Sequence, residues 1–170
     1  MTARRFDPTR RLLIAGGGAS LALAGCGFKL REAPNFAFHT IALAETSPYL
    51  KQLKRAIEVT GTLKVLPMAE ASNAEAVFDL LGESRDRVVL STNSAGQVRE
   101  MQLYLRVRFR VRTPAGKELI APSLVEQWRD ITYNETAALA KENEEQLLYR
   151  DMTSDVVQQT LRRLAAVKAV

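Results

Sequence analysis

One side chain in this sequence can do specific chemistry because of the residues around it: Cys26, the only cysteine in 170 residues. It directly follows Leu23-Ala24-Gly25, where small side chains would let a narrow peptidase groove hold the chain. Its thiolate is the form that can make a thioether bond to a diacylglycerol. The sequence therefore predicts Cys26 as a lipidation site. An unmodified thiol is the alternative, because a lone cysteine excludes only an internal disulfide.

The residues before Cys26 have the layout of a secretory signal. Four arginines make its start positive: Arg4, Arg5, Arg10 and Arg11. The apolar run 12–24 that follows is too short to cross a bilayer as a stable helix. In this context residues 23–26 resemble a lipobox, so residues 1–25 are predicted to be removed on export. Arg10 and Arg11, with the residues around them, also resemble a weak twin-arginine signal, which exports folded proteins. Nothing downstream suggests a cofactor that must be inserted before export, which favours the route that exports unfolded chains.

The remainder of the chain is predicted to be a lipid-anchored domain. Residues 26–35 form a lipidated tether and residues 36–168 a single folded domain. An Asp after the lipidated cysteine commonly retains such lipoproteins at the inner membrane. Gly27 stands there instead, which favours the periplasmic face of the outer membrane. After residues 1–25 are removed, 145 residues remain, with 20 basic against 18 acidic side chains; this near balance argues against nucleic acid as a partner.

A file of arginines is the second feature with chemical potential. Residues 101–112 alternate strictly, with apolar side chains on one face of a strand and four arginines on the other: Arg106, Arg108, Arg110 and Arg112. Same-face neighbours on a strand are about 6.5–7 Å apart. Guanidinium groups bind phosphates and carboxylates in a bidentate manner, so the file suits a polyanion.

The more common alternative is a solvated sheet face on which arginines pair with acids on neighbouring strands. Glu83, Asp86 and Glu126 are available for this pairing. Catalysis has little support, because the single histidine, His39, alternates with apolar residues and is better explained as structural. The crowded acids Glu142, Glu144 and Glu145 are typical of a solvated helix turn. Trp128 fits either a core or a contact surface. We expect no enzyme activity, cofactor or metal.

The elements around the arginine file predict an α+β fold. Ser47-Pro48 opens a predicted helix that ends near Gly61. Short turns join long alternating segments, which predicts an antiparallel meander. We expect a two-layer sandwich, with two helices on one face of an about four-stranded, mostly antiparallel sheet. The predicted elements are a strand at 36–43, a helix at 48–61, a strand or loop at 62–74, strands at 76–91, 97–112 and 118–133, and a helix at 134–166, either continuous or broken near Asn143.

Three stretches carry a resemblance to a known family. The lipobox continues as Cys26-Gly27-Phe28-Lys29-Leu30-Arg31 and is followed by the strand Phe38-His39-Thr40-Ile41-Ala42-Leu43. Further on come Arg129-Asp130-Ile131-Thr132-Tyr133-Asn134 and Ala138-Leu139-Ala140-Lys141-Glu142-Asn143-Glu144. In this order the stretches resemble the LptE family of LPS-assembly lipoproteins.

The resemblance implies a non-enzymatic function. Members of the family sit as a plug inside the outer-membrane β-barrel LptD, deliver lipopolysaccharide (LPS) to the outer leaflet with it, and assist assembly of the barrel. They are held to bind LPS through basic residues, so we assign Arg106, Arg108, Arg110 and Arg112 as candidate LPS contacts. A pilotin-like or other outer-membrane accessory lipoprotein that binds a protein partner is the alternative. An envelope enzyme ranks third.

The lipidation site gives the first testable prediction. Intact-mass measurement of the wild-type protein should show loss of residues 1–25 and added acyl chains, whereas Cys26→Ala should leave the unlipidated precursor, because no other thiol can accept the lipid. A mature wild-type protein without acyl mass would contradict the assignment.

Overall fold

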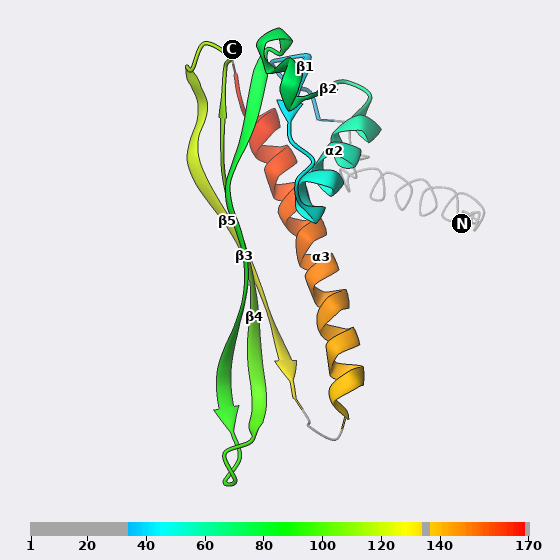
Figure 1. The fold of residues 1–170 in the computed structure, drawn as a ribbon, viewed down its shortest axis with the longest axis vertical. Helices are drawn as coiled ribbons and strands as arrows, with labels where there is room; N and C mark the ends of the chain where they lie inside the picture. Colours follow the sequence, from blue (N-terminus) through cyan, green and yellow to red (C-terminus); the bar gives the residue numbers. More distant parts are fainter. Residues whose placement is uncertain (1–33, 134–136, 169–170) are drawn as a thin grey trace, which may run out of the picture. The chain divides into compact units, whose positions relative to one another are not determined.

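The computed structural model describes residues 34–133 and 137–168, which form two layers (Figure 1). Cys26 and the rest of the predicted signal and tether up to residue 33 lie outside the described residues. One layer is a five-stranded sheet in the order β2-β1-β3-β4-β5, and the two long helices cover one of its faces. In chain order the elements are β1 (Thr40–Leu43), α2 (Pro48–Thr60), β2 (Lys64–Pro67), the 3-10 helix η1 (Met68–Asn73), β3 (Ala76–Thr92), β4 (Val98–Arg112), β5 (Glu118–Thr132) and α3 (Ala138–Ala165).

Strands β3, β4 and β5 form the predicted antiparallel meander. The first turn is closed by the side chain of Asn93, whose Oδ1 accepts from the backbone N–H groups of Ala95 and Gln97. In the second turn Thr113 Oγ1 accepts from the N–H of Lys117. Each turn also contains a glycine at positive φ, a conformation that side chains with a Cβ rarely adopt. The sequence prediction of two short turns is confirmed.

Helix α2 begins and ends at the predicted residues. Ser47 Oγ accepts from the N–H of Leu50 at 3.2 Å, and Pro48 stands at the first helical position. Gly61 ends the helix at φ 67°, with its N–H donating to the carbonyl of Glu58. Both caps satisfy backbone groups that the helix itself leaves unpaired. They fix the end of α2 just before the chain returns to the sheet.

The N-terminal part of the sheet is shorter and more mixed than the sequence indicates. Only Thr40–Leu43 of the predicted strand 36–43 pairs, and it lies parallel to both β2 and β3. The segment predicted as a strand or loop supplies β2, a fifth strand, because α2 carries the chain back in the direction that parallel pairing requires. On the face of the sheet that α2 and α3 leave uncovered, η1 packs on a small apolar cluster that contains Ala42 and Val77.

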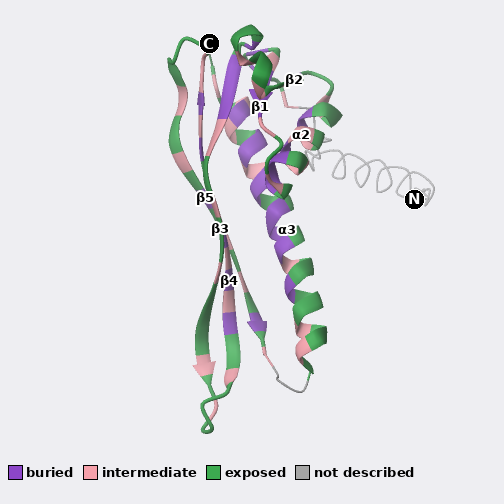
Figure 2. Cartoon of the chain, viewed as in Figure 1, coloured by how far each residue is buried: buried purple, intermediate pink, exposed green. Residues whose placement is uncertain are grey.

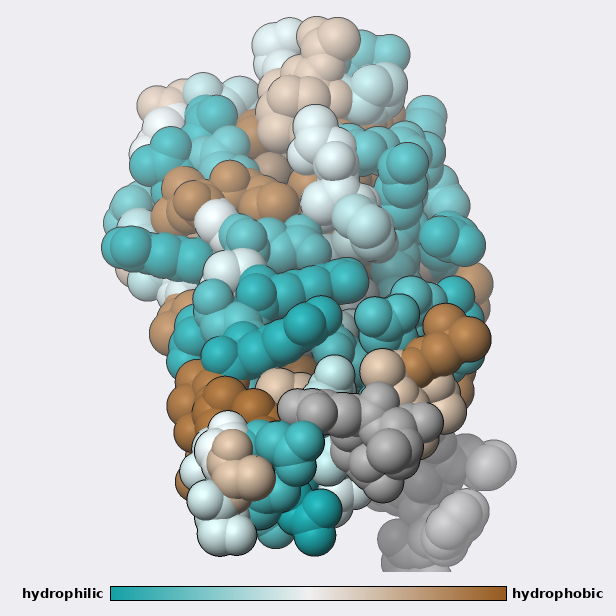
Figure 3. All heavy atoms as spheres, turned by 60° about the horizontal axis from the view of Figure 1, so that its bottom comes forward, coloured by the Kyte–Doolittle hydropathy of each residue, from teal (hydrophilic) through white to brown (hydrophobic). Residues whose placement is uncertain are grey.

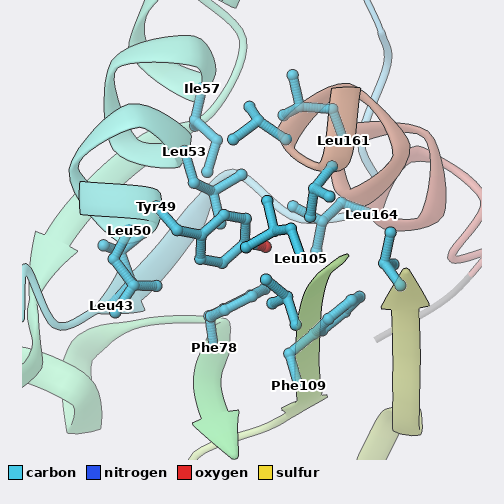
Figure 4. Close-up of a cluster of buried hydrophobic side chains, with 14 of the residues drawn as sticks. Leu43, Tyr49, Leu50, Leu53, Ile57, Phe78, Leu105, Phe109, Leu161 and Leu164 are labelled. Atoms are coloured by element: carbon cyan, nitrogen blue, oxygen red, sulfur yellow. The ribbon is translucent and has the colours of Figure 1, made fainter. Parts of the chain in front are cut away.

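The core lies between the sheet and the two helices. Phe78 of β3 and Phe109 of β4 stack with ring centroids 5.0 Å apart, and both rings are buried. Figure 4 shows them below apolar side chains from α2 and α3. Helix α3 is continuous through Asn143, so of the two alternatives that the sequence leaves open the unbroken helix is the correct one. Its sheet-facing side is buried, while its outer side is exposed (Figure 2). One apolar layer thus holds both helices on the sheet.

A buried hydrogen-bond chain joins the two helices inside this core. Tyr49 Oη lies 2.9 Å from Thr160 Oγ1, and the hydroxyl of Thr160 donates to the carbonyl of Val156 at 2.9 Å. Tyr49 is therefore the donor to Thr160. Burial raises the pKa of Tyr49 far above its ordinary value, so the phenol stays protonated and can donate.

Strand β5 forms one edge of the sheet. Its pairing with β4 is irregular around Pro122, because proline has no N–H to donate. Two of its carbonyls are bonded to guanidinium groups: Arg163 Nη2 donates to Leu124 O at 3.1 Å, and Arg129 Nη1 donates to Trp128 O at 2.8 Å. Arginine side chains thus cover part of this edge.

We predict that Tyr49→Phe lowers the free energy of unfolding by about 1 kcal/mol, because it removes one buried hydrogen bond and leaves the packing unchanged. Urea unfolding followed by circular dichroism measures this. Val59→Ala, a change on the exposed side of the same helix, should alter stability by no more than about 0.5 kcal/mol. An equal effect of both variants would show that the hydrogen bond contributes nothing.

Candidate functional site on the outer face of the sheet

The predicted alternation of β4 is confirmed. The apolar side chains at alternate positions from Met101 to Val111 are buried under the helices. The four arginines of the file point to the opposite side, the outer face of the sheet, which neither long helix covers. The side chains of Arg106 and Arg110 are 36% and 39% exposed, so the file is open to solvent.

A β-bulge in β3 determines what lies beside the arginines. Leu80 pairs with Phe109 and Gly82 with Arg108, so Leu81 is an extra residue with no partner. Because side chains alternate along a strand, one inserted residue exchanges the faces of the residues that follow, here as far as the next register shift after Val89. Before the bulge Asp79 lies on the outer face opposite Arg110.

Beyond the bulge the acids of β3 separate onto different faces. Asp86 pairs with Tyr104 and lies on the outer face, whereas Glu83 pairs with buried Val107 and turns towards the helices. The interpretation of Glu83 as a partner for the arginine file is therefore wrong. Its Oε2 is buried and has no hydrogen-bond partner within the described ranges.

At one end of the file two arginines share one carboxylate. Arg110 Nε and Arg112 Nε both donate to Asp79 Oδ2 at 2.8 Å. Partial burial opposes ionisation of Asp79, but the hydrogen bonds from Arg112 and Arg110 outweigh it and lower the pKa of this carboxyl. Asp79 is therefore held as an anion between the two guanidinium groups, a partner that the sequence analysis did not identify.

At the other end one arginine has two carboxylates. Arg106 Nη1 donates to Asp86 at 2.9 Å, and its Nε donates to Glu126 on β5. The guanidinium also lies 4.3 Å from the centre of the Tyr104 ring, within the range of a cation–π interaction. For these two acids the sequence expectation of cross-strand pairing is confirmed.

Arg108 differs from its three neighbours. Within the described ranges it makes no ion pair, hydrogen bond or ring contact, although Gly82 faces it on β3 and Leu124 on β5. It lines a shallow hollow of about 220 Å³ together with Gly82, Glu83, Ser84, Arg106 and Leu124. The file is thus three paired arginines and one unpaired one.

Apolar side chains share the outer face with these charges. Leu124 and Trp128 on β5 are 52% and 51% exposed, and Val88 on β3 is 44% exposed. Their strand partners, Arg108, Tyr104 and Gln102, all belong to the outer face. Figure 3, which looks towards the β3–β4 hairpin, shows apolar patches separated by bands of hydrophilic side chains. Trp128 therefore lies on the exposed outer face and not in the core.

The bulge also turns two basic residues of β3 towards α3. Arg87 Nε donates to Glu145 at 2.9 Å, and the Arg85 guanidinium lies 5.0 Å from the centre of the Tyr149 ring. Glu145 is 9% exposed, so the interpretation of residues 142–145 as a wholly solvated turn is wrong for this residue. His39 is exposed just before β1, and its backbone N–H donates to Glu75 at 2.7 Å.

Neither a metal-ligand cluster nor a membrane-spanning helix is found over 34–133 and 137–168. The domain superposes on the solution structure of an uncharacterized lipoprotein B from Nitrosomonas europaea with a TM-score of 0.70, at 31% identity, over 82% of this chain and 91% of that one. The rare lipoprotein B of Shewanella oneidensis shares the fold at a TM-score of 0.62 and 24% identity, over 75% of this chain and 92% of that one. The class is thus an α+β lipoprotein domain.

Sequence comparison identifies the family. The family model for LptE, described as lipopolysaccharide-assembly, matches residues 38–164. The LPS-assembly lipoproteins LptE of Pectobacterium atrosepticum and Yersinia enterocolitica are each 30% identical to the chain. These alignments cover 93% and 94% of this chain, and 86% and 78% of the relatives. The chain belongs to the LptE family of LPS-assembly lipoproteins, as the resemblance in the sequence predicts.

The ion pairs of Asp79 predict a pH-dependent contribution to stability. A carboxyl whose pKa is lowered by folding stabilises the fold above its ordinary pKa of 3.8, and this contribution is lost as pH falls through the lowered value. Asp79→Asn should therefore reduce the free energy of unfolding by about 1 kcal/mol at neutral pH, since the partner side chains are partly exposed. The difference from wild type should shrink towards zero in strong acid.

Urea unfolding of Asp79→Asn and of wild type at several pH values tests the predicted pH dependence of the stability difference. Asp151→Asn is the matched control, because Asp151 is exposed and has no ion pair within the described part of the chain. A loss for Asp79→Asn that stays constant with pH would show that the ionised carboxylate is not its cause.

Proposed function

We propose that this chain is an outer-membrane lipoprotein, anchored through Cys26, that forms the plug of the LptD β-barrel and assists assembly of LPS into the outer leaflet. The match of the LptE family model to residues 38–164, nearly the whole described domain, is the observation that carries this proposal. The lipobox supports the lipid anchor at Cys26, and Gly27 supports the outer membrane as the location. The role is non-enzymatic, that of a binding and assembly subunit.

The outer face supports direct contact with LPS in this role. LPS combines anionic groups with hydrocarbon chains, and a surface that binds it needs cations close to exposed apolar side chains. The arginine file on β4 lies beside Leu124 and Trp128 of β5. Arginine suits phosphate groups because its donors match two oxygens at once. LPS binding by this face is therefore part of the proposal.

Co-purification from detergent-solubilised outer membrane tests the partnership. We expect a large β-barrel, identified as LptD by mass spectrometry, at one-to-one stoichiometry with the tagged full-length chain. Secretin subunits in its place would favour the accessory-lipoprotein alternative and overturn the proposal. Cys26→Ala provides the control for anchoring, since it removes the acceptor of the lipid, and residues 1–25 are expected to remain attached to a domain of unchanged sequence.

Depletion in the cell tests the assembly role. In a strain with no second member of the family, depletion should lower both correctly assembled LptD and surface LPS, and expression of the wild-type chain should restore them. Normal levels of both after complete depletion would contradict the proposal.

A further inference from the structure

We propose that Arg108 is the anion contact of the outer face and binds one phosphate group of an amphiphile in the hollow between Gly82 and Leu124. The other three arginines are paired with carboxylates and do not bind the ligand themselves. This inference rests on the proposed function and deepens it, because it replaces a general basic surface by one guanidinium and one class of ligand.

The charges on the outer face single out Arg108. Arg110 and Arg112 already share Asp79, and Arg106 is already bonded to two carboxylates. A phosphate that approached any of these would compete with a carboxylate held at hydrogen-bonding distance. Three carboxylates form ion pairs with the file, and all of these pairs are made by Arg106, Arg110 and Arg112. Arg108 is the arginine without a carboxylate partner in the described part of the chain.

The space around Arg108 also admits a ligand. Its partner on β3 is Gly82, and a Cβ built there meets no heavy atom within 4 Å. The position where a cross-strand acid would stand is therefore empty. By contrast, Arg106 has Glu126 as its partner on β5, and Arg110 has Asp79 as its partner on β3. The β-bulge places Gly82, and not the larger Leu81, opposite Arg108.

The other side of the hollow determines the class of ligand. Leu124 lies opposite Arg108 on β5 with half of its surface exposed, and Trp128 follows on the same face of the same strand. Exposed apolar side chains beside a free cation suit a phosphate attached to hydrocarbon better than a free phosphate. Bidentate pairing with the guanidinium would hold the phosphate, while the hydrocarbon covers Leu124.

Binding of bisphosphorylated lipid A to the mature, detergent-solubilised protein tests the site. We expect Arg108→Gln to weaken binding about tenfold, as loss of one charge-assisted hydrogen-bonded pair does, and to leave the melting temperature within a few degrees of wild type. Arg110→Gln, which leaves Asp79 paired with Arg112, should change affinity by about twofold or less.

A second pair of variants tests the site without removing any arginine. Gly82→Glu should supply the missing cross-strand carboxylate and weaken lipid A binding as much as Arg108→Gln does. Arg108 would then have an acidic partner, as the other three arginines already do. Gly82→Gln, of nearly equal size and without charge, should retain most of the affinity. Gly82 is not among the glycines at positive φ, so both side chains are compatible with its backbone.

Two further probes separate the sources of the phosphate. The wild-type protein should bind dephosphorylated lipid A about as weakly as the Arg108→Gln variant binds lipid A. Inorganic phosphate should compete only weakly with lipid A for the wild-type protein. Inorganic phosphate that binds as tightly as lipid A would overturn the amphiphile as ligand. Unchanged lipid A affinity in a folded Arg108→Gln variant would overturn the Arg108 site but not the proposal that the protein binds LPS. A wild-type protein that binds no lipid A would contradict both the site and LPS binding.

Discussion

In β3, Leu81 has no partner on β4, and residues 82–89 lie on the face opposite to the one that plain alternation would give. This one-residue insertion determines most of the polar structure. It sends Arg85 and Arg87 towards α3, where Tyr149 and Glu145 receive them. It also brings Asp86 to the outer face, where it bonds Arg106. The two layers and the charged face therefore depend on the same local irregularity.

The stabilising core and the proposed binding surface lie on different faces of the same strands. The apolar side of β4 packs under the helices around Phe78 and Phe109, and this burial supplies most of the free energy of folding. The outer side contributes less, because ion pairs between partly exposed groups are weakly stabilising. Substitutions there are therefore less constrained by folding. A binding surface on this side can vary in charge and hydrophobicity while the fold persists.

Much of the fold follows from local patterns that sequence reasoning captures. Ser47, Pro48 and Gly61 mark the ends of α2, and the strict alternation of β4 assigns its faces. The β-bulge was not predicted, because Leu81 stands between apolar Leu80 and small Gly82, and nothing in these residue types indicates an inserted position. Glu83 was wrongly included as an arginine partner, because plain alternation places it on the same face as Asp79. Asp79 itself lies before the bulge and was missed although plain alternation also places it on the outer face. The unpaired state of Arg108 is likewise a property of register, which a single strand's sequence does not contain.

The arginines on β5 bear on how copies of this chain behave towards each other. A fifteen-residue edge strand offers carbonyl and N–H groups to which a second extended chain can add, and this is a common route to aggregation. Arg163 and Arg129 occupy the carbonyls of Leu124 and Trp128, and Pro122 removes one donor. An arriving strand would have to displace both guanidinium groups before it could pair. We therefore expect the domain to stay monomeric at high concentration, and loss of Arg163 to favour self-association before it affects the fold.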